Sequence, residues 1–482
     1  MPRLGKPLIY LLIGLLAAGL LSCQPPEKEL PGVARMQIVL AQNQMPKPVY
    51  FLEDTTHNRV NFELYYFDAS GSFLTLSDKP QFLVNGQPFA GSSYIFTRAG
   101  QYTFTARLNN RVCDNQLDLR VSPVREYIDH FVLSSFVPVL NADSVSQLPL
   151  SYQLITKQGE FLDPLAYASP RLRADGKELA ESNYFATGQA GIHTLQATFL
   201  GMASGGLDLT ARRAVTYPLV RLPVVIHLAQ NVDSLGIDPA KLLAGVNRLY
   251  RKAQRTIDPN QADSFLEFYP APIDPGGRPL ALAGLHRLAI NNPATREGAV
   301  AAINALLQQW CPQRYINVVM GIDWARLYSA SRSYAYLPNL PQGPSELTCE
   351  DLVKANWSSP PAIYLSDPYQ PSILSHELGH FLGLPHTFSS SCPSGPAAFT
   401  DLPKHLEALP DASGLKYSCD THSFRSEYAM DYYVPQLSFT YDQVKLMRRL
   451  VEFGGYIPRS PPPAGRRRRT QPIALESGHI LF

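Results

Sequence analysis

Residues 376–386 constrain the fold of this 482-residue chain more than any other feature, because they read His-Glu-Leu-Gly-His-Phe-Leu-Gly-Leu-Pro-His. Two histidines four positions apart lie one turn apart on the same face of a helix, so His376 and His380 are expected to face one point. Gly383 marks the place where that helix must end, because glycine reaches positive φ without a Cβ clash. The chain then turns back and brings His386 toward the same point.

The residue types in this segment indicate a metal site. Three neutral imidazole nitrogens suit zinc, and a fourth coordination position left open to water is typical of catalytic rather than structural zinc sites. Glu377 stands beside the ligands, where a carboxylate can reach that water as a general base. Three alternatives stay open: ordinary core or surface histidines, a degenerate metal site without activity, and zinc that serves only as a folding staple.

The same segment resembles a known group of proteins. Its pattern is the zinc signature of the metzincins, and its continuation through Thr387 and Phe388 is similar to the pappalysin (cytophagalysin) family. The resemblance spans about residues 218 to 453 and says nothing about the N-terminal half. Its further matches are Pro223–His227, Tyr315–Met320, Tyr334–Pro338, Met430–Tyr432 and Phe439–Gln443.

The resemblance implies an α/β metzincin-like domain with one catalytic Zn²⁺, whose ligands are His376, His380 and His386 and whose general base is Glu377. The implied function is that of a zinc-dependent endopeptidase that hydrolyses peptide bonds of extracellular or surface proteins. The competing interpretation is a surface adhesin or binding lipoprotein whose metzincin-like domain is inactive. The intact Glu377 favours the enzyme, since a binding module has no need of a base beside its metal.

Three further expectations rest on the resemblance. Met430 would form the apolar floor of a Met-turn beneath the imidazoles. A tyrosine at the spacing of Tyr432 hydrogen-bonds the tetrahedral intermediate in some metzincins, and the alternative is a packed, structural Tyr432. The family's stretch linked with calcium is reduced here to Phe399–Pro403, which keeps only the Asp and the Pro and leaves a Ca²⁺ site doubtful.

The first 22 residues predict an export signal. Arg3 and Lys6 form a basic start, residues 8–21 are apolar over a length short for a membrane span, and Leu20-Leu21-Ser22-Cys23 resembles a bacterial lipobox. In that pattern Cys23 is acylated and becomes the N-terminus. We therefore expect an exported chain that is lipid-anchored to the bacterial outer membrane or cell surface. The alternative is an uncleaved anchor helix.

Five cysteines remain after Cys23, and an oxidising compartment favours disulfides between them. An odd number leaves at least one cysteine free. Cys311 with Cys349 and Cys392 with Cys419 are the candidate pairs, although spacing alone leaves the connectivity open. Cys113 is expected to be a buried structural cysteine in a strand.

An internal repeat predicts two tandem all-β Ig-like sandwiches at residues 35–123 and 124–216, after a tether at 23–34. Gly71–Leu74 recurs as Gly159–Leu162, and Ala99–Thr103 recurs as Ala190–Thr194. Asn85-Gly86 and its counterpart Asp175-Gly176 are hairpin-turn signals. Such modules could bind a surface ligand. The alternative is one larger β domain.

Residues 217–456 change to strands that alternate with helices, which predicts an α/β layer. Asp238-Pro239 and Asn292-Pro293 are helix starts, and Thr440 with Gln443 forms a capping box for a last helix that ends near Glu452. Apolar strands are expected at 222–228, 265–269, 315–320 and 362–365. The segment 334–337 is a candidate edge where a substrate strand would pair.

Composition excludes several classes of protein. Hydrophobic residues make up 45% and charged residues 17%, which excludes disorder and collagen-like repeats for most of the chain. The net charge is +2, and removal of Arg3 and Lys6 with the signal leaves 40 basic and 40 acidic residues. A neutral chain gives no electrostatic case for nucleic-acid binding. Residues 457–482, with Pro461–Pro463 and Arg466–Arg469, are expected to be a disordered tail.

Overall fold

The computed structural model describes residues 30, 32–41, 47, 49–54, 57–180, 183–229, 236–288, 295–321, 333–335, 349, 360–365, 370–392 and 399–458. The predicted export signal, Cys23, most of the tether and the tail beyond residue 458 lie outside these residues. The chain forms two compact units, one of residues 1–132, 152–170 and 198–204, the other of residues 133–151, 171–197 and 205–482. Within the described ranges, none of the helices has the length and apolarity that crossing a membrane requires.

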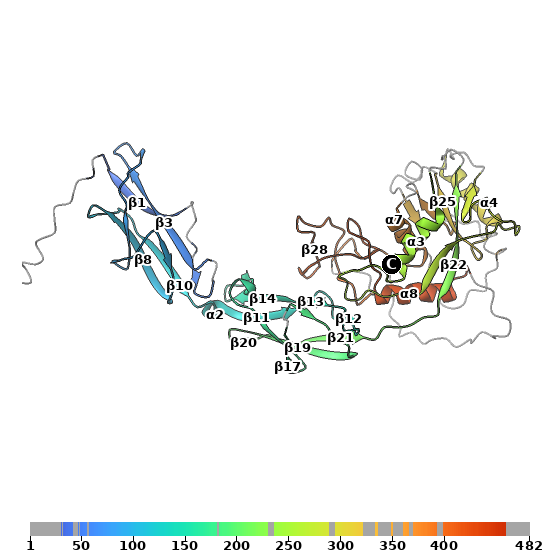
Figure 1. Ribbon diagram of the computed structural model, residues 1–482, viewed down its shortest axis with the longest axis horizontal. Helices are drawn as coiled ribbons and strands as arrows, with labels where there is room; N and C mark the ends of the chain where they lie inside the picture. The colour runs from blue at the N-terminus through green and yellow to red at the C-terminus, as the bar shows by residue number, and fades with distance from the viewer. Residues whose placement is uncertain are drawn as a thin grey trace, which may run out of the picture. The chain divides into compact units, whose positions relative to one another are not determined.

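The first β region folds into two sheets, labelled in part in Figure 1. One has the order β1-β3-β4 with β7 paired to β3, and the other has the order β2-β10-β8-β5-β6 with β9 paired to β8. Alternate residues of β3 (Val60, Phe62, Leu64) are buried, as one apolar face of a strand requires. The strands are β1 (Arg35–Leu40), β2 (Tyr50–Phe51), β3 (Arg59–Phe67), β4 (Phe73–Leu74), β5 (Gln81–Val84), β6 (Gln87–Pro88), β7 (Ser93–Ile95), β8 (Gly100–Leu108), β9 (Arg111–Val112) and β10 (Leu117–Ser122).

The second β region repeats these pairings. Its sheets have the orders β11-β14-β15, β12-β21-β19-β16-β17 with β20 paired to β19, and β13-β18. Its elements are α2 (Val124–Tyr127), β11 (Ile128–Ser134), β12 (Val139–Asn141), β13 (Leu148–Pro149), β14 (Ser151–Thr156), β15 (Phe161–Leu162), the 3-10 helix η2 (Pro164–Ala166), β16 (Arg171–Ala174), β17 (Lys177–Glu178), β18 (Tyr184–Phe185), β19 (Gly191–Phe199), β20 (Met202–Ala203) and β21 (Leu207–Arg212). The region contributes residues to both compact units, so the predicted domain boundaries stay predictions.

The turn signals of the repeat are confirmed in both copies. Asn85 and Gly86 join β5 to β6 with φ of 49° and 78°, and Asp175 and Gly176 join β16 to β17 with 49° and 79°. Positive φ at both central positions is the geometry that twists with a hairpin. The side-chain Oδ1 of each first residue also accepts a hydrogen bond from a backbone amide of the neighbouring strand in the sheet, Asn85 from Thr103 of β8 and Asp175 from Thr194 of β19, both at 2.9 Å.

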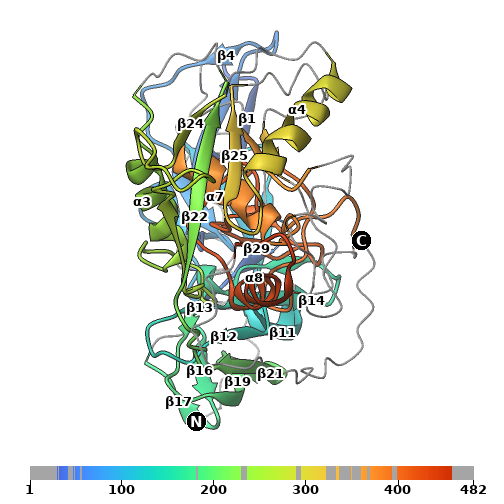
Figure 2. The same cartoon turned by 90° about the vertical axis from the view of Figure 1, so that its right-hand side faces the viewer.

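The C-terminal region is a mostly parallel sheet between helices, as predicted. The strand order is β23-β22-β25-β27-β26 with β24 paired to β22, and only β26 runs antiparallel. Figure 2 views β22 and β25 with α3 and α4 beside them. The elements are β22 (Val220–Leu228), α3 (Pro239–Tyr250), β23 (Leu266–Pro270), β24 (Leu285–Arg287), α4 (Arg296–Gln309), β25 (Ile316–Met320), β26 (Ser333–Ala335), β27 (Ile363–Leu365), α7 (Pro371–Phe381), β28 (Lys416–Tyr417), β29 (Ser423–Phe424) and α8 (Tyr441–Phe453).

Both faces of this sheet are covered, which explains its almost continuous apolar strands. Val224, Ile226 and Leu228 of β22 pack into one core together with residues of α3, α7 and α8. Val225 faces the other way and packs with α4. The sheet therefore separates α4 from the layer that contains the 376–386 motif.

The helix-start signals were largely right. Asp238 accepts hydrogen bonds from the amides of Ala240 and Lys241 and begins α3, and the Thr440–Gln443 capping box begins α8. Helix α4 begins at Arg296 with Thr295 as its N-cap, because the Thr295 hydroxyl accepts the amide of Gly298. Residues 292–293, where that start was predicted, lie outside the described residues, as do 336–338 beyond β26.

Candidate metal centre

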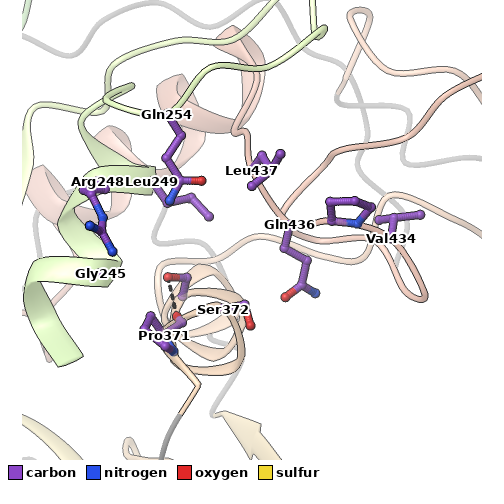
Figure 3. A pocket seen from close by; sticks show the side chains of 11 residues that line it. Gly245, Arg248, Leu249, Gln254, Pro371, Ser372, Val434, Gln436 and Leu437 are labelled. Carbon is purple, nitrogen blue, oxygen red and sulfur yellow. Dashed lines mark hydrogen bonds between the residues drawn. The ribbon is translucent and has the colours of Figure 1, made fainter.

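Helix α7 is placed against α3 by a close crossing. A Cβ atom on Gly245 of α3 would lie 2.6 Å from Cγ of Pro371, the first residue of α7, so only glycine allows this approach. Figure 3 labels Gly245 on α3 and Pro371 at the start of α7. Deeper in the same contact, the Tyr250 hydroxyl donates to the Ser375 carbonyl at 3.1 Å. The motif helix is therefore fixed by the rest of the domain.

The end of α7 has the geometry that its glycine predicts. Gly383 has φ of 86°, and its amide donates to the His380 carbonyl at 2.8 Å. The Leu384 amide donates to the Gly379 carbonyl at 2.9 Å. This pair of bonds is the Schellman motif, which ends a helix and turns the chain back over its last turn. His386 reaches the helix face by this turn.

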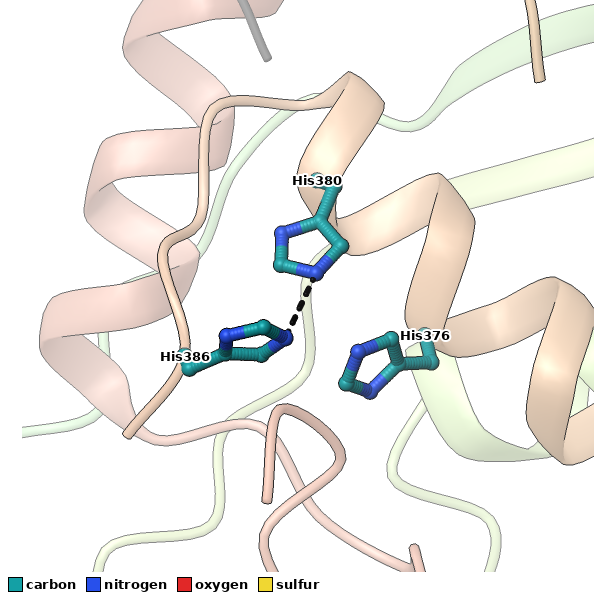
Figure 4. Close-up of side chains that lie close together, drawn as sticks. All are labelled: His376, His380 and His386. Carbon is teal, nitrogen blue, oxygen red and sulfur yellow. Dashed lines mark hydrogen bonds between the residues drawn. The ribbon is translucent and has the colours of Figure 1, made fainter. Parts of the chain in front are cut away.

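The three predicted histidines converge. One ring nitrogen from each of His376, His380 and His386 can be chosen so that all lie within 4.8 Å of one another. The Nε2 atoms of His380 and His386 are 3.1 Å apart, the pair joined by the dashed line in Figure 4. Two ligands about 2.0–2.1 Å from a tetrahedral zinc ion stand about 3.3 Å apart, so this spacing fits a shared ion.

Hydrogen bonds to backbone carbonyls set the ring orientations. His376 Nδ1 donates to the Ala429 carbonyl at 2.8 Å, and His380 Nδ1 donates to the Leu384 carbonyl at 2.7 Å. A proton held on Nδ1 leaves the Nε2 lone pair free for a metal. Burial lowers the pKa of His376, and burial, followed by the neighbouring histidines, lowers the pKa of His380 to about 3 and that of His386 to about 4. The donor set is therefore neutral, as a metal site needs.

Glu377 is buried next to these ligands without a compensating charge. Burial raises the pKa of its carboxyl to about 8, and within the described part of the chain Oε2 has no hydrogen-bond partner. A buried carboxylate needs a nearby positive charge or donors to stay ionised. A cation held by the three imidazoles would supply that charge. The residues present therefore fit a divalent metal.

Met430 lies beneath the helix, where a Met-turn would place it. It is fully buried, and a Cβ atom on Gly379 would overlap its sulfur. Its carbonyl accepts the amide of Thr387 at 3.1 Å, which ties this turn to the segment just after His386. Gly379 is thus required for the sulfur to reach the helix, a role that the sequence pattern did not reveal.

Tyr432 lies beside the same cluster. Its ring centroid is 4.6 Å from that of His386 and 5.6 Å from that of His376. Burial, followed by the charge of Glu377, raises the pKa of its phenol to about 12. The phenol therefore keeps its proton and can serve as a hydrogen-bond donor.

Sequence reasoning missed a buried ion pair that holds this turn. Lys416 Nζ donates to Asp431 Oδ1 at 2.7 Å and to the Tyr432 carbonyl at 2.9 Å, while the Tyr432 amide donates to Asp431 Oδ1 at 2.8 Å. Asp431 also accepts from Ser426 and lies 3.5 Å from His405 Nε2. Hydrogen bonds and charge from His405, Lys416 and Ser426 outweigh burial and lower the pKa of Asp431. The sequence did not indicate a role for Lys416, because it lies on the two-residue strand β28 and in none of the motifs described above.

The other predicted residues fall as follows. Cys311–Cys349 and Cys392–Cys419 are disulfide-bonded, and Cys113 is free and buried. Asp401, the acidic residue kept in the altered calcium-linked stretch, is buried; it accepts the Thr440 hydroxyl and the Asp442 amide, both at 2.9 Å, and so caps α8. His227 bonds Asn317 and His286, and His422 bonds Ser134, so neither is grouped with the three ligands.

A match to a known family falls on the same region. Residues 302–452 match the family model described as pregnancy-associated plasma protein-A, and a comparison with curated proteins gives no match. Among solved structures, mirolysin in complex with compound 9 is 20% identical over 50% of this chain and 94% of that chain, with a TM-score of 0.38. Mature mirolysin of Tannerella forsythia with a cleaved peptide is 18% identical over 50% and 94%, with a TM-score of 0.37. Invasin, a bacterial integrin-binding protein, is 12% identical over 37% and 39%, with a TM-score of 0.20.

The matched residues contain α7, the three histidines, the Met430 turn and all but the last residue of α8. The family match and the metal-site geometry thus fall on one segment. Across residues 302–452, the α/β region of this chain is therefore similar to the pappalysin family of metalloproteases.

Proposed function

We propose that this chain is a zinc-dependent endopeptidase that hydrolyses peptide bonds of extracellular or surface proteins. The observation that carries the proposal is the convergence of three neutral imidazoles with one buried carboxyl group, that of Glu377, whose Oε2 atom has no hydrogen-bond partner among the described residues. His376, His380 and His386 would hold the ion. Zinc bound there supplies Lewis acidity toward a water molecule and toward the carbonyl of the scissile bond.

Glu377 would carry the proton in this reaction. Its Oε2 accepts a proton from the attacking water and returns it to the leaving amine, so that one carboxyl serves as base and then as acid. Its burial suits both roles, because a pKa displaced from the usual carboxyl range toward neutrality allows the proton to move either way.

Tyr432 would act on the tetrahedral intermediate. The phenol keeps its proton, and its ring stands against His376 and His386. A donor held in this position can stabilise the developing oxyanion.

The test is cleavage of a complex peptide mixture, read by mass spectrometry of new termini. The Glu377→Ala variant and a chelator are the controls for chemistry, and Glu452→Gln, at an exposed position of α8, is the control for carboxylate loss. We expect new termini with the wild type and with Glu452→Gln, and at least a ~100-fold slower appearance with Glu377→Ala. Absence of cleavage by folded, zinc-loaded protein would favour the adhesin interpretation.

We also propose that the chain is exported and anchored through an acylated Cys23. The two disulfides support an oxidising compartment, since such bonds persist mainly outside the cytosol. We expect labelled palmitate to be incorporated by the wild type in a bacterial host, and a Cys23→Ala variant to lose the label and leave the membrane fraction. Retention of both by the variant would rule out this anchor.

A further inference from the structure

A pocket of about 400 Å³ lies beside the first turns of α7. Three segments and Gln254 line it: α3 lies on one side, the start of α7 below, and residues 434–437, after the Met430 turn, on the other side (Figure 3). Its volume is within the range of sites that take a small ligand or a side chain. The pocket therefore has room for one residue of a bound peptide.

The pocket borders the metal centre. Ser375, which lines it, directly precedes His376 in the chain. Gln436, on the opposite wall, has its Nε2 atom 3.3 Å from His376 Nδ1 and donates to the Asp431 carbonyl at 3.0 Å. A peptide with its carbonyl at the three imidazoles would thus carry a neighbouring side chain past His376 into this space.

The charge of the pocket comes from one residue. Of the eleven lining residues, Arg248 alone is charged, and no carboxylate is among them. Within the described part of the chain, the structure gives the Arg248 guanidinium no ion-pair or hydrogen-bond partner. Arg251, the C-cap residue directly after this helix, is different, since it pairs with Asp263 at 3.0 Å. An unpaired guanidinium at a pocket wall favours an anionic occupant and disfavours a cationic one.

We propose that this pocket takes an acidic side chain, Asp or Glu, of the bound peptide next to the scissile bond, and that Arg248 determines this specificity. The inference rests on the proposed endopeptidase function and names its substrate class. The side chain's carboxylate would accept from the guanidinium, while the Ser372 and Gln436 side chains offer neutral polar contacts. A lysine or arginine side chain would meet like charge there.

The first test is cleavage of acetylated, amidated alanine hexapeptides that carry Glu, Gln or Lys at one position in turn. We expect kcat/KM for Glu to exceed that for Lys by about fivefold at the position that enters the pocket, because exposed charge pairs contribute little more than this. In Arg248→Glu the order should reverse. Lys241→Glu, an equal charge change at an exposed position of the same helix, should keep the wild-type order. An unchanged order in Arg248→Glu would overturn the proposal.

A second test separates this proposal from the proposed chemistry. Binding of the same Glu and Lys peptides is measured with Glu377→Ala and with Glu377→Ala/Arg248→Glu, both loaded with zinc. Tighter binding of the Glu peptide to the first, lost in the second, supports the pocket assignment even if no peptide is cleaved. Equal binding of both peptides to both variants overturns it even if cleavage occurs.

Discussion

Lys416 fixes the backbone of Tyr432 at two points. Its Nζ atom donates to the Tyr432 carbonyl, and it also pairs with Asp431, whose carboxylate accepts the Tyr432 amide. Removing one partner of a buried ion pair leaves an uncompensated charge, which costs about 3–5 kcal/mol. We expect Lys416→Met to lower the free energy of unfolding of the α/β region by about this amount, measured by urea titration. Lys416→Met/Asp431→Asn should recover part of the loss. A loss as small as that of an exposed lysine variant would show that the pair does not hold the turn.

His227 should make the stability of the α/β region sensitive to acid. It is fully buried, and burial lowers its pKa to about 3. An unfolded histidine titrates near 6.5, so the unfolded state binds more protons below that pH, and stability falls as the pH drops from about 6.5 toward 3. At pH 5 this one residue should cost about 2 kcal/mol relative to pH 7.5.

The measurement for His227 is urea unfolding at several pH values, followed by tryptophan fluorescence. All three tryptophans lie at positions 310–357, and Trp310 is 5.1 Å from His227 between ring centroids. His227→Gln should flatten the slope of stability against pH, whereas His130→Gln, at an exposed position, should leave it unchanged. An equal slope in wild type and His227→Gln would contradict the assignment.

The packing of α7 against the Met430 turn depends on one residue from each, Gly379 and Met430. Gly379→Ala would overlap the Met430 sulfur, so we expect a loss of about 1–3 kcal/mol of stability and weaker zinc binding. Met430→Ala should also destabilise, by leaving a cavity. The methyl group added at position 379 would occupy space that the shorter side chain at position 430 leaves. The double variant should therefore be more stable than the sum of the two single effects predicts. Strict additivity, measured by thermal unfolding, would mean that the two residues do not touch.

Elements were predictable where the sequence determines local geometry. The spacing of His376 and His380 requires a helix, and Asn85-Gly86 requires positive φ in consecutive residues, so both could be located from the sequence. Lys416 could not, because its role depends on a strand that pairs far from the motif. Arg248 is similar: its helix was predicted, but its place at a pocket depends on how α3 crosses α7.

At the scale of the whole molecule, the sequence pattern changes near residue 217 from alternating strands to strands separated by helices. This change correctly predicted that β regions are followed by an α/β region. It did not predict that part of the second β region joins the larger compact unit. Within that unit, Asn141 Nδ2 donates to the Gln261 carbonyl at 2.9 Å, and Asn260 Nδ2 donates to the Val139 carbonyl at 3.0 Å. Contacts between residues about 120 positions apart leave no trace in local periodicity.

Bound metal should add to the stability of the α/β region, although the region folds without it. Helix α7 is held by the core that α3, α8 and the sheet share, and by the Tyr250–Ser375 hydrogen bond, none of which involves the metal ligands. Zinc at 1,000 times its Kd would add about 4 kcal/mol to the free energy of unfolding. We therefore expect chelation to lower the Tm of the α/β region while leaving it folded at 25 °C.

Hydrogen exchange with and without a chelator locates this effect along the chain. Loss of protection should be confined to residues 380–390 and 426–436, where the third ligand and the Met430 turn meet. Apart from the last two residues of α7, these segments have loop conformations joined by few backbone bonds. Strand β8, in the other compact unit, serves as the internal control, and added zinc should restore the original pattern. If protection were lost throughout β22–β27, zinc would be a folding staple, and if nothing changed, the three histidines would not hold a metal. A local, reversible change is the result that a catalytic site on a separately stabilised scaffold requires.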